Sequence, residues 1–418
     1  MSTAFKPADI LIPQNTDMNK WAVIACDQYT SEPEYWKNLK NYIGNENSTL
    51  NLILPEVYLE DSDVSERIDK IHSAMESYMK SGVFNEYPDA MVYVERIQSN
   101  GVLRSGIIGK IDLEEYDFSK GSTSQVRATE ATVIERIPPR IKVREGAVLE
   151  LPHIMILIDD EKQNAIEQFA ELKNSMKELY NFELNCQGGH IGGWLMDRNM
   201  TEKFQSALDE LGNTEKFREK YHTDNVLIYA MGDGNHSLAT AKAFYENLKK
   251  SDPSKDWSNH PARYALVELV NLHSPALDFE AIHRIVNNVN TEKLIREMTE
   301  KLGLSDEKSD QSFVYVTGNT KKRIYIHNKS SNLSVGSLQN FLDEFVKENQ
   351  AKIDYIHGES TLKKLVSETE NSIGFILPDM DKSDLFPTVI KDGALPRKTF
   401  SMGHAQDKRY YIECRKIV

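Results

Sequence analysis

A strand, a two-glycine turn and a helix start follow one another without a spacer at positions 225–242, which read NVLIYAMGDGNHSLATAK. The run from Val226 to Met231 is apolar, with β-branched and aromatic members, and this pattern is typical of a buried strand. Leu238 begins a helical spacing of apolar residues, so we expect a helix that starts at or just after Asn235 or Ser237, either of which is a good N-cap. This unit favours an α/β fold of the mixed α+β kind.

The turn itself brings reactive groups to the start of a helix. Its glycines let a ligand approach the backbone closely, and the free N–H groups of a helix start attract an anion. Asp233 and His236 add a carboxylate and an imidazole at the same position. The turn could therefore supply an anion seat, a proton acceptor and a metal contact. The alternative is a plain strand-to-helix connection whose Asp and Asn only cap backbone groups.

Composition bounds the classes of protein that remain. A chain of 418 residues with 40% hydrophobic and 27% charged residues can bury a large core and predicts two or three domains. We expect three regions: 1–120, an N-terminal α/β region with a hairpin; 121–290, a central region with Arg-rich strands and the glycine turn; and 291–418, a C-terminal α/β region. The net charge of −14 argues against a nucleic-acid partner but allows a phosphorylated substrate in a locally basic cleft.

The cysteines and the apolar runs indicate a cellular compartment. Cys26, Cys186 and Cys414 are odd in number and far apart, so neither a disulfide framework nor a zinc site is implied. The N-terminus has no apolar stretch typical of a signal peptide, and no apolar run approaches the roughly 18 residues of a membrane span. We expect a cytoplasmic protein with small-molecule substrates and no membrane partner, and leave a homo-oligomer open.

A second polar cluster also lies between a predicted strand and a predicted helix. The strand is expected at 21–25 and the helix from Ser31, with Asp27 between them. Helix capping explains Ser31 better than it explains Asp27, which leaves Asp27 as a candidate ligand.

Arginines gather in the next informative stretch. Four of them, Arg127, Arg136, Arg140 and Arg144, fall within eighteen residues and are interleaved with glutamates such as Glu130. Guanidinium groups match phosphate oxygens in bidentate fashion, whereas the alternative is a solvated strand face with weak ion pairs.

A pair of carboxylates closes the strand predicted at 154–158. Asp159 and Asp160 could hold Mg²⁺ or cap the helix that follows, and we favour capping for Asp160. Helices are expected at 63–80, 163–180 and 263–272, and a hairpin around Asn100-Gly101.

The C-terminal segment supplies a second set of basic residues. Arg397, Lys398, Thr399 and His404 lie close together, and further basic residues follow at 408–409. The segment is a candidate anion clamp, and the alternative is a basic exposed tail.

Several of these stretches resemble one family, DUF1015. They are YAMGDGNHS (229–237), VRATEATVIERIPPR (126–140), LPHIMILIDD (151–160), YIHG (355–358) and PRKTF (396–400), and the match runs from about Ala8 to the C-terminus. Many members carry Asp-Gly-His-His-Arg at the turn, where this chain has Asn235 and Ser237. The positive charge of the missing Arg would then have to come from Arg397, Lys398 or Arg127.

The turn is also similar to that of ParB/sulfiredoxin-like kinases that phosphorylate free serine. The resemblance implies a ParB/sulfiredoxin-like core elaborated with additional α/β segments, and a Mg²⁺-dependent kinase using pyrophosphate or ATP/ADP as donor and a hydroxy amino acid such as L-serine as acceptor. The residues expected to carry this reaction are Asp233, His236 and Glu130 (catalytic), Arg127, Arg140, Asn235, Ser237, Arg397, Lys398, Thr399 and His404 (substrate and phosphate), and Asp27 and Asp233 (metal). A phosphoester or nucleotide hydrolase and a non-catalytic ligand-binding regulatory protein are the alternatives.

Overall fold

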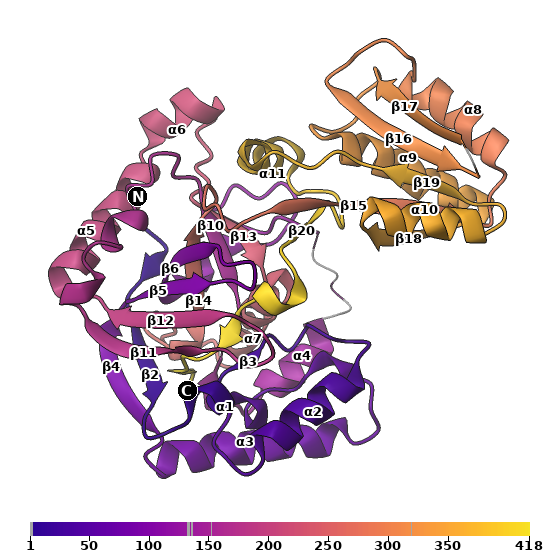
Figure 1. Ribbon diagram of the computed structural model, residues 1–418. Helices are drawn as coiled ribbons and strands as arrows, with labels where there is room; N and C mark the ends of the chain where they lie inside the picture. The colour runs from indigo at the N-terminus through magenta and orange to yellow at the C-terminus, as the bar shows by residue number, and fades with distance from the viewer. Residues whose placement is uncertain (1–2, 132–133, 135–136, 152, 319) are drawn as a thin grey trace. The chain divides into compact units, whose positions relative to one another are not determined.

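The computed structural model describes residues 3–131, 134, 137–151, 153–318 and 320–418. The chain forms two compact units (Figure 1). Unit 1 comprises Met1–Leu277 and His404–Val418, and unit 2 comprises Asp278–Gly403. The chain therefore leaves unit 1 once and returns to it for its last segment. The division of the sequence into three consecutive regions stays a prediction.

A large mixed sheet forms the centre of unit 1. Its strands, in spatial order, are β11 (Lys177–Glu183), β12 (His190–Leu195), β5 (Val92–Ile97), β6 (Leu103–Asp112), β14 (Tyr264–Asn271), β10 (Met155–Ile158), β13 (Tyr229–Asp233), β8 (Val126–Arg127) and β7 (Tyr116–Asp117), with β1 (Phe5–Lys6) beside β6. The strand β10 runs parallel to β14 and antiparallel to β13. The carboxyl end of β10 therefore lies beside the carboxyl end of β14, and its amino end lies beside the carboxyl end of β13.

Helices accompany this sheet. They are α1 (Met18–Trp21), α2 (Pro33–Ile43), α3 (Val64–Lys80), α4 (Ile137–Arg144), α5 (Arg198–Leu211), α6 (Thr214–Tyr221) and α7 (Asn235–Ser251). The predicted helix at 63–80 is confirmed as α3, which buries Ile68, Ile71 and Met75 along one face. The hairpin predicted around Asn100-Gly101 is confirmed as β5 and β6.

Two short antiparallel ribbons join the C-terminal segment to the rest of unit 1. They pair β3 (Val23–Ile24) with β21 (Tyr410–Tyr411), and β9 (Leu149–Glu150) with β22 (Arg415–Lys416). A further ribbon pairs β2 (Ala8–Pro13) with β4 (Phe84–Ala90). In Figure 1 the yellow C-terminal segment accordingly lies beside the indigo β3. Residues about 385 positions apart in sequence thus become neighbours, as the hydrogen bond between Cys26 and Tyr411 shows.

Unit 2 has a sheet of its own. Its strands, in spatial order, are β17 (Thr320–Ile326), β16 (Gln311–Thr317), β19 (Ile373–Ile376), β15 (Phe279–Asn287) and β18 (Lys352–His357), with β20 (Phe400–Met402) also beside β15. The helices of unit 2 are α8 (Thr291–Leu302), α9 (Ser334–Asn349), α10 (Glu359–Glu368) and α11 (Leu385–Asp392). Strands and helices in both units confirm the mixed α/β class.

The helix predicted at 163–180 is wrong. Residues Glu167–Phe169 and Lys173–Ser175 form single 3₁₀ turns, and the chain then enters β11. The strand β11 closes one edge of the sheet by pairing with β12. These interstrand hydrogen bonds override a helical spacing of apolar residues, which is a weak preference by itself.

The helix predicted at 263–272 is wrong as well, because this segment is the strand β14. The strand lies between β6 and β10, and Ala265 to Asn271 are all buried. A strand buried on both faces is apolar throughout, and such a run cannot be distinguished from a buried helix by spacing.

The prediction of Arg-rich strands is also wrong, because most of the described arginines of this stretch lie on a helix. Among the described residues of the stretch 126–144, Val126–Arg127 pairs as a strand, and Arg140 and Arg144 lie on α4. Prolines 138 and 139 fall in the first turn of that helix, where a missing N–H group costs nothing. The predicted Arg136 lies outside the described residues.

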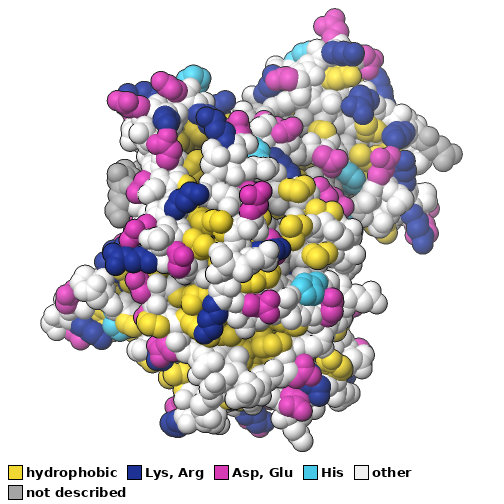
Figure 2. All heavy atoms as spheres, turned by 60° about the vertical axis from the view of Figure 1, so that its left-hand side comes forward, with side chains coloured by type: hydrophobic (Ala, Val, Ile, Leu, Met, Phe, Trp, Pro, Cys, Tyr) yellow, Lys and Arg dark blue, Asp and Glu magenta, His cyan; other side chains and the backbone are white. Residues whose placement is uncertain are grey.

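Two further features concern the charge of the surface and the suitability of the helices for a membrane. On the face shown in Figure 2, Lys and Arg side chains are interspersed with Asp and Glu side chains rather than gathered by sign. Among the residues that the structure describes, no helix combines the length and the apolar character needed to cross a bilayer.

Candidate functional site

The glycine turn lies where it is predicted, between β13 and α7, but its cap differs. Gly234, rather than Asn235 or Ser237, is the N-cap, and it has a left-handed φ of +79°. A Cβ atom there would lie 3.2 Å from Ile154 Cα, so both the backbone conformation and the close approach to the neighbouring strand require glycine. The turn is thereby held against the residues that lead into β10.

Asn235 joins the turn to the predicted Arg-rich stretch. Its Oδ1 accepts a hydrogen bond from the Thr129 N–H at 3.3 Å, and the Thr129 hydroxyl donates to the Met231 carbonyl at 2.8 Å. These bonds hold the segment that follows β8 against the start of α7. Glu130, the next residue in that segment and half-buried, is therefore placed close to the turn.

A buried histidine connects the turn to Asp27. His153 Nε2 lies 3.1 Å from Ser237 Oγ and 3.6 Å from Asp27 Oδ2. Its other ring nitrogen, Nδ1, is hydrogen-bonded to the Tyr411 hydroxyl at 2.7 Å, and that hydroxyl also accepts the N–H of Cys26. Two ends of the chain thus fix one imidazole, whose side chain is only 7% exposed.

A lysine from the C-terminal segment completes the arrangement. Lys408 Nζ lies 3.1 Å from Asp233 Oδ2, and Asp233 Oδ1 also accepts the N–H of Gly234 at 3.0 Å. Both side chains are half-buried, with exposed fractions of 15% and 24%. We name the five residues Asp27, His153, Asp233, Ser237 and Lys408 the α7 cluster.

The backbone of Lys408 is held from behind by a buried arginine. Arg96 donates to the carbonyls of Lys408 and Gln406, each at 2.7 Å, and is fully buried. Burial, together with the nearby Arg104, lowers the pKa of Arg96 to about 9. The lysine therefore extends from a fixed backbone rather than from a free tail.

The charges in the α7 cluster act on each other. Burial is the largest single influence and disfavours the charged forms of Asp27 and His153, but the charge attraction and hydrogen bonds of the pair and its neighbours together outweigh it, so the pKa of Asp27 is lowered and the pKa of His153 is raised. Asp233 also contributes to raising the pKa of His153, and Lys408 to lowering that of Asp27. Two carboxylates thus face two cations in a small, largely buried volume.

This geometry differs from the triad of serine hydrolases. In that triad the serine and the carboxylate contact opposite nitrogens of the histidine ring. Here Ser237 and Asp27 both face Nε2, and Nδ1 contacts the Tyr411 hydroxyl. The arrangement suits charge stabilisation better than activation of Ser237 as a nucleophile.

The predicted arginines of unit 1 have partners elsewhere. Arg127 is buried, and it donates to the carbonyls of Ser124 and Asn225, each at 2.7 Å. Burial lowers the pKa of Arg127 to about 10. Arg127 lies beside Ala230, towards the start of β13, whereas Asp233 is the last residue of that strand. Arg140 forms an ion pair with Glu56.

Three predicted phosphate ligands lie in unit 2. Arg397 forms an ion pair with Asp343, the Thr399 hydroxyl donates to the Pro396 carbonyl at 2.6 Å, and Lys398 is exposed. Their assignment to a phosphate stays a prediction. In unit 1, His404 is exposed at the start of the returning segment, and His236 is half-buried in the first turn of α7.

Sequence patterns alone do not identify His153, Lys408 and Tyr411 as site residues. His153 stands just before an apolar strand, and Lys408 belongs to a basic pair, but these local patterns do not indicate which distant carboxylate each will face. Their roles depend on the pairing of β21 with β3 and of β10 with β13. A single sequence carries no local signal for such pairings.

The chain is similar to several solved structures at 12% identity or less. No curated protein matches the chain. Among solved structures, a free serine kinase in complex with AMP is 12% identical with a TM-score of 0.38, covering 74% of this chain and 91% of that one. A conserved hypothetical protein from Pyrococcus furiosus is 12% identical with a TM-score of 0.37, covering 72% and 93%. SbnI with C-terminal truncation from Staphylococcus aureus is 10% identical with a TM-score of 0.34, covering 74% and 81%.

The match to a family model is more extensive. The model of DUF1015, described as a protein of unknown function, matches residues 6–345. This span includes the glycine turn, His153 and Asp27, and it extends from unit 1 into unit 2. It covers well over half of the chain, and the chain therefore belongs to the DUF1015 family.

Proposed function

We propose that this protein is a small-molecule kinase that transfers a phosphoryl group from a nucleotide or pyrophosphate to a hydroxy amino acid such as L-serine. The observation that carries the proposal is the α7 cluster. Its carboxylates and cations come from four distant segments and meet at the start of a helix. Phosphoryl transfer needs this combination, because its catalysis is mainly positioning and neutralisation of negative charge.

The phosphate groups of the donor would bind at the start of α7. The first N–H groups of a helix point outward, and the helix dipole favours an anion there. Lys408 and His153 would add two positive charges on the same side, and the Ser237 hydroxyl would donate a further hydrogen bond. Lys408 would thereby supply the charge that many family members carry as Arg at the position of Ser237.

Asp233 is our choice for the group that accepts the proton of the acceptor hydroxyl. It is a partly exposed carboxylate beside Lys408, so a hydroxyl bound to it would lie near the transferring phosphoryl group. Asp27 is less suitable, because its lowered pKa makes it a weaker base. His236 and Glu130 remain the alternatives for this role.

A magnesium ion fits the chemistry of the same residues. Asp27 and Asp233 are partly exposed carboxylates, both close enough to His153 to raise its pKa, and Mg²⁺ prefers such oxygen ligands. When bound, the ion would neutralise phosphate charge. Asp27 and Asp233 would hold it, and Lys408 and His153 would then be released to contact the donor.

The proposal is tested with purified protein, Mg²⁺ and each donor in turn: ATP, ADP or pyrophosphate, with and without L-serine. We expect serine-dependent formation of O-phosphoserine, detected by ³¹P NMR. Release of phosphate without any acceptor would instead favour the hydrolase. A ligand-dependent rise in melting temperature without turnover would favour a binding protein.

A variant pair then links the activity to the site. Asp233→Asn should abolish most turnover while changing the free energy of unfolding by about 1–2 kcal/mol, as expected for a half-buried pair. Asp224→Asn is the matched control, because Asp224 also pairs with a cation but is 64% exposed, and it should leave turnover unchanged. Equal losses of turnover and stability in Asp233→Asn would contradict the proposal.

A further inference from the structure

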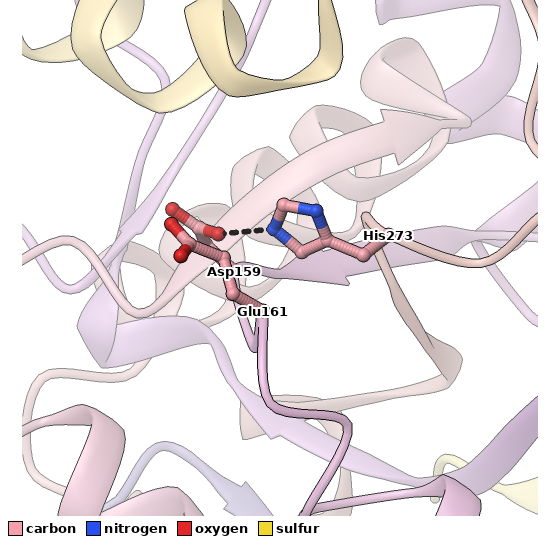
Figure 3. Close-up of side chains that lie close together, drawn as sticks. All are labelled: Asp159, Glu161 and His273. Carbon is pink, nitrogen blue, oxygen red and sulfur yellow. Dashed lines mark hydrogen bonds and ion pairs between the residues drawn. The ribbon is translucent and has the colours of Figure 1, made fainter.

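We propose that Asp159, Glu161 and His273 form a separate binding site for a divalent transition-metal ion. Their ligand atoms all lie within 4.8 Å of one another. Figure 3 shows the two carboxylates close together, with the imidazole ring of His273 facing them. The inference does not depend on the proposed kinase activity.

The topology of the sheet explains why these residues meet. The strands β10 and β14 are parallel neighbours, with Ile158 opposite Asn271. Asp159 directly follows β10, and His273 follows β14 after one intervening residue. The carboxyl ends of adjacent parallel strands are the edge where α/β sheets bind ligands.

This site lies at the opposite end of β10 from the α7 cluster. His153 precedes the strand and Asp159 follows it, and six residues of extended chain span about 20 Å. One strand therefore leads from one group of ionisable side chains to the other. A metal bound at Asp159 would not be the ion expected at Asp27 and Asp233.

The distances are close to those that a metal requires. His273 Nε2 lies 2.6 Å from Asp159 Oδ1. Two ligand atoms that are each about 2.1 Å from one ion lie at most about 4.2 Å apart, so the widest separation in the group need shrink only slightly. Glu161 can make this adjustment, because its side chain is 62% exposed.

The two loops that carry the ligands are tied together by one buried amide. Asn271 is fully buried; its Nδ2 donates to the Asp160 carbonyl at 2.9 Å, and its Oδ1 accepts the His273 N–H at 3.2 Å. The Tyr221 hydroxyl in turn donates to Asp159. Outer partners of this kind fix the orientation of metal ligands.

Asp160 has a different task from Asp159. Its carboxylate accepts the Ala165 N–H at 2.7 Å and so closes the following turn, whereas the helix that we expected it to cap is replaced by single 3₁₀ turns. The carboxylate of Asp159 faces the imidazole instead. Asp160 thus holds the backbone of the turn, whereas Asp159 faces His273.

Lys220 indicates that this position attracts a cation. Its Nζ lies 2.9 Å from Asp159 Oδ2 and 2.7 Å from Glu161 Oε1. Two carboxylates and one ammonium leave one negative charge, and the lysine side chain, which is 39% exposed, can move into solvent. A divalent ion would take the place of the ammonium group.

The ligand set favours a particular class of ion. An imidazole nitrogen beside carboxylate oxygens suits Mn²⁺, Fe²⁺ or Zn²⁺, whereas Mg²⁺ and Ca²⁺ prefer oxygen ligands alone. Mn²⁺ is the better probe here, because it has little affinity for the free thiols of Cys26 and Cys186.

The test is a Mn²⁺ titration of EDTA-treated full-length protein, with free Mn²⁺ measured by electron paramagnetic resonance. We expect His273→Ala to weaken one binding site by at least about 100-fold. Lys220→Met, which keeps every ligand, should tighten the same site by about tenfold, because it removes the competing ammonium group. His357→Ala, which removes an exposed histidine of unit 2, is the control and should have no effect.

Three results would overturn the inference. The first is the absence of stoichiometric Mn²⁺ binding in both the unmodified protein and Lys220→Met. The second is binding that survives in His273→Ala and is lost in Asp233→Asn, which would assign the ion to the α7 cluster. The third is weaker binding in Lys220→Met, since a purely structural ion pair would lose order when its lysine is removed.

Discussion

Replacing Lys408 by methionine should separate catalysis from stability. Lys408 Nζ lies 3.1 Å from Asp233 Oδ2, and both side chains keep some contact with solvent. Loss of such a half-buried pair costs about 1–2 kcal/mol of unfolding free energy, which lies between the values for exposed and for buried pairs. Loss of a positioned group that stabilises transition-state charge costs about 10²–10³ in kcat, or about 2.7–4 kcal/mol. The effect on turnover should therefore exceed the effect on folding.

The assay measures O-phosphoserine formation and urea unfolding on the same preparations. Lys416→Met is the matched control, because Lys416 lies in the same C-terminal segment and pairs with Glu86 at 2.7 Å, but on the surface. We expect Lys408→Met to lose most turnover, Lys408→Arg to retain part of it, and Lys416→Met to behave like the unmodified protein. Methionine retains most of the apolar length of lysine, so packing changes little.

Two results would refute this reasoning. Unchanged turnover in Lys408→Met would show that the lysine does not act on the phosphoryl group. An equal fall in turnover for Lys408→Met and Lys416→Met would show that the whole segment is sensitive to substitution, and that the position of Lys408 beside Asp233 has no special role.

Stability should also depend on pH through one pair and on sterics through one glycine. Because the pKa of His153 is raised in the folded protein, its contribution is complete below its ordinary value of 6.5 and is lost as pH rises through the raised value. Asp27 has a lowered pKa, so its contribution is present above 3.8 and is lost only as pH falls through the lowered value. In EDTA-containing buffer, His153→Gln should therefore reduce the free energy of unfolding more at about pH 5.5 than at about pH 9, and urea titrations that show equal losses would contradict this assignment. Gly189 and Gly121 share a φ of +81°, but a Cβ atom at Gly189 would lie 2.1 Å from the Ile97 carbonyl oxygen, whereas none of the described atoms lies within 4 Å of one at Gly121. Gly121→Ala should cost about 1 kcal/mol and Gly189→Ala at least about 2 kcal/mol more, as measured by urea unfolding, and similar costs would show that backbone strain alone matters.

Local patterns predict those elements whose residues interact with near neighbours. The amphipathic spacing at 64–80, the Asn-Gly hairpin and the order of strand, turn and helix around Asp233 are all of this kind. The segment 264–271 was wrongly predicted as a helix, because a strand buried on both faces lacks the alternation of apolar and polar residues that marks a strand. The helix predicted at 163–180 is wrong because hydrogen bonds of its last residues to the strand β12 determine the structure there.

The candidate site likewise combines residues placed by a local motif with residues placed by distant pairings. Asp233, Asn235 and Ser237 could be found from the turn, since their positions follow from one local motif. The approach of His153 and Lys408 to that motif depends on sheet pairings across 84 residues in one case and on the return of the C-terminal segment in the other. A family resemblance adds weight to the turn, but it does not show which cation replaces an absent arginine.

The most direct test of the central claim is a crystal structure of the protein with pyrophosphate or ADP and Mg²⁺. The account predicts a phosphate group at the start of α7, within hydrogen-bonding distance of Lys408 Nζ and Ser237 Oγ. A phosphate bound elsewhere, with the ion pair between Lys408 and Asp233 undisturbed, would contradict it.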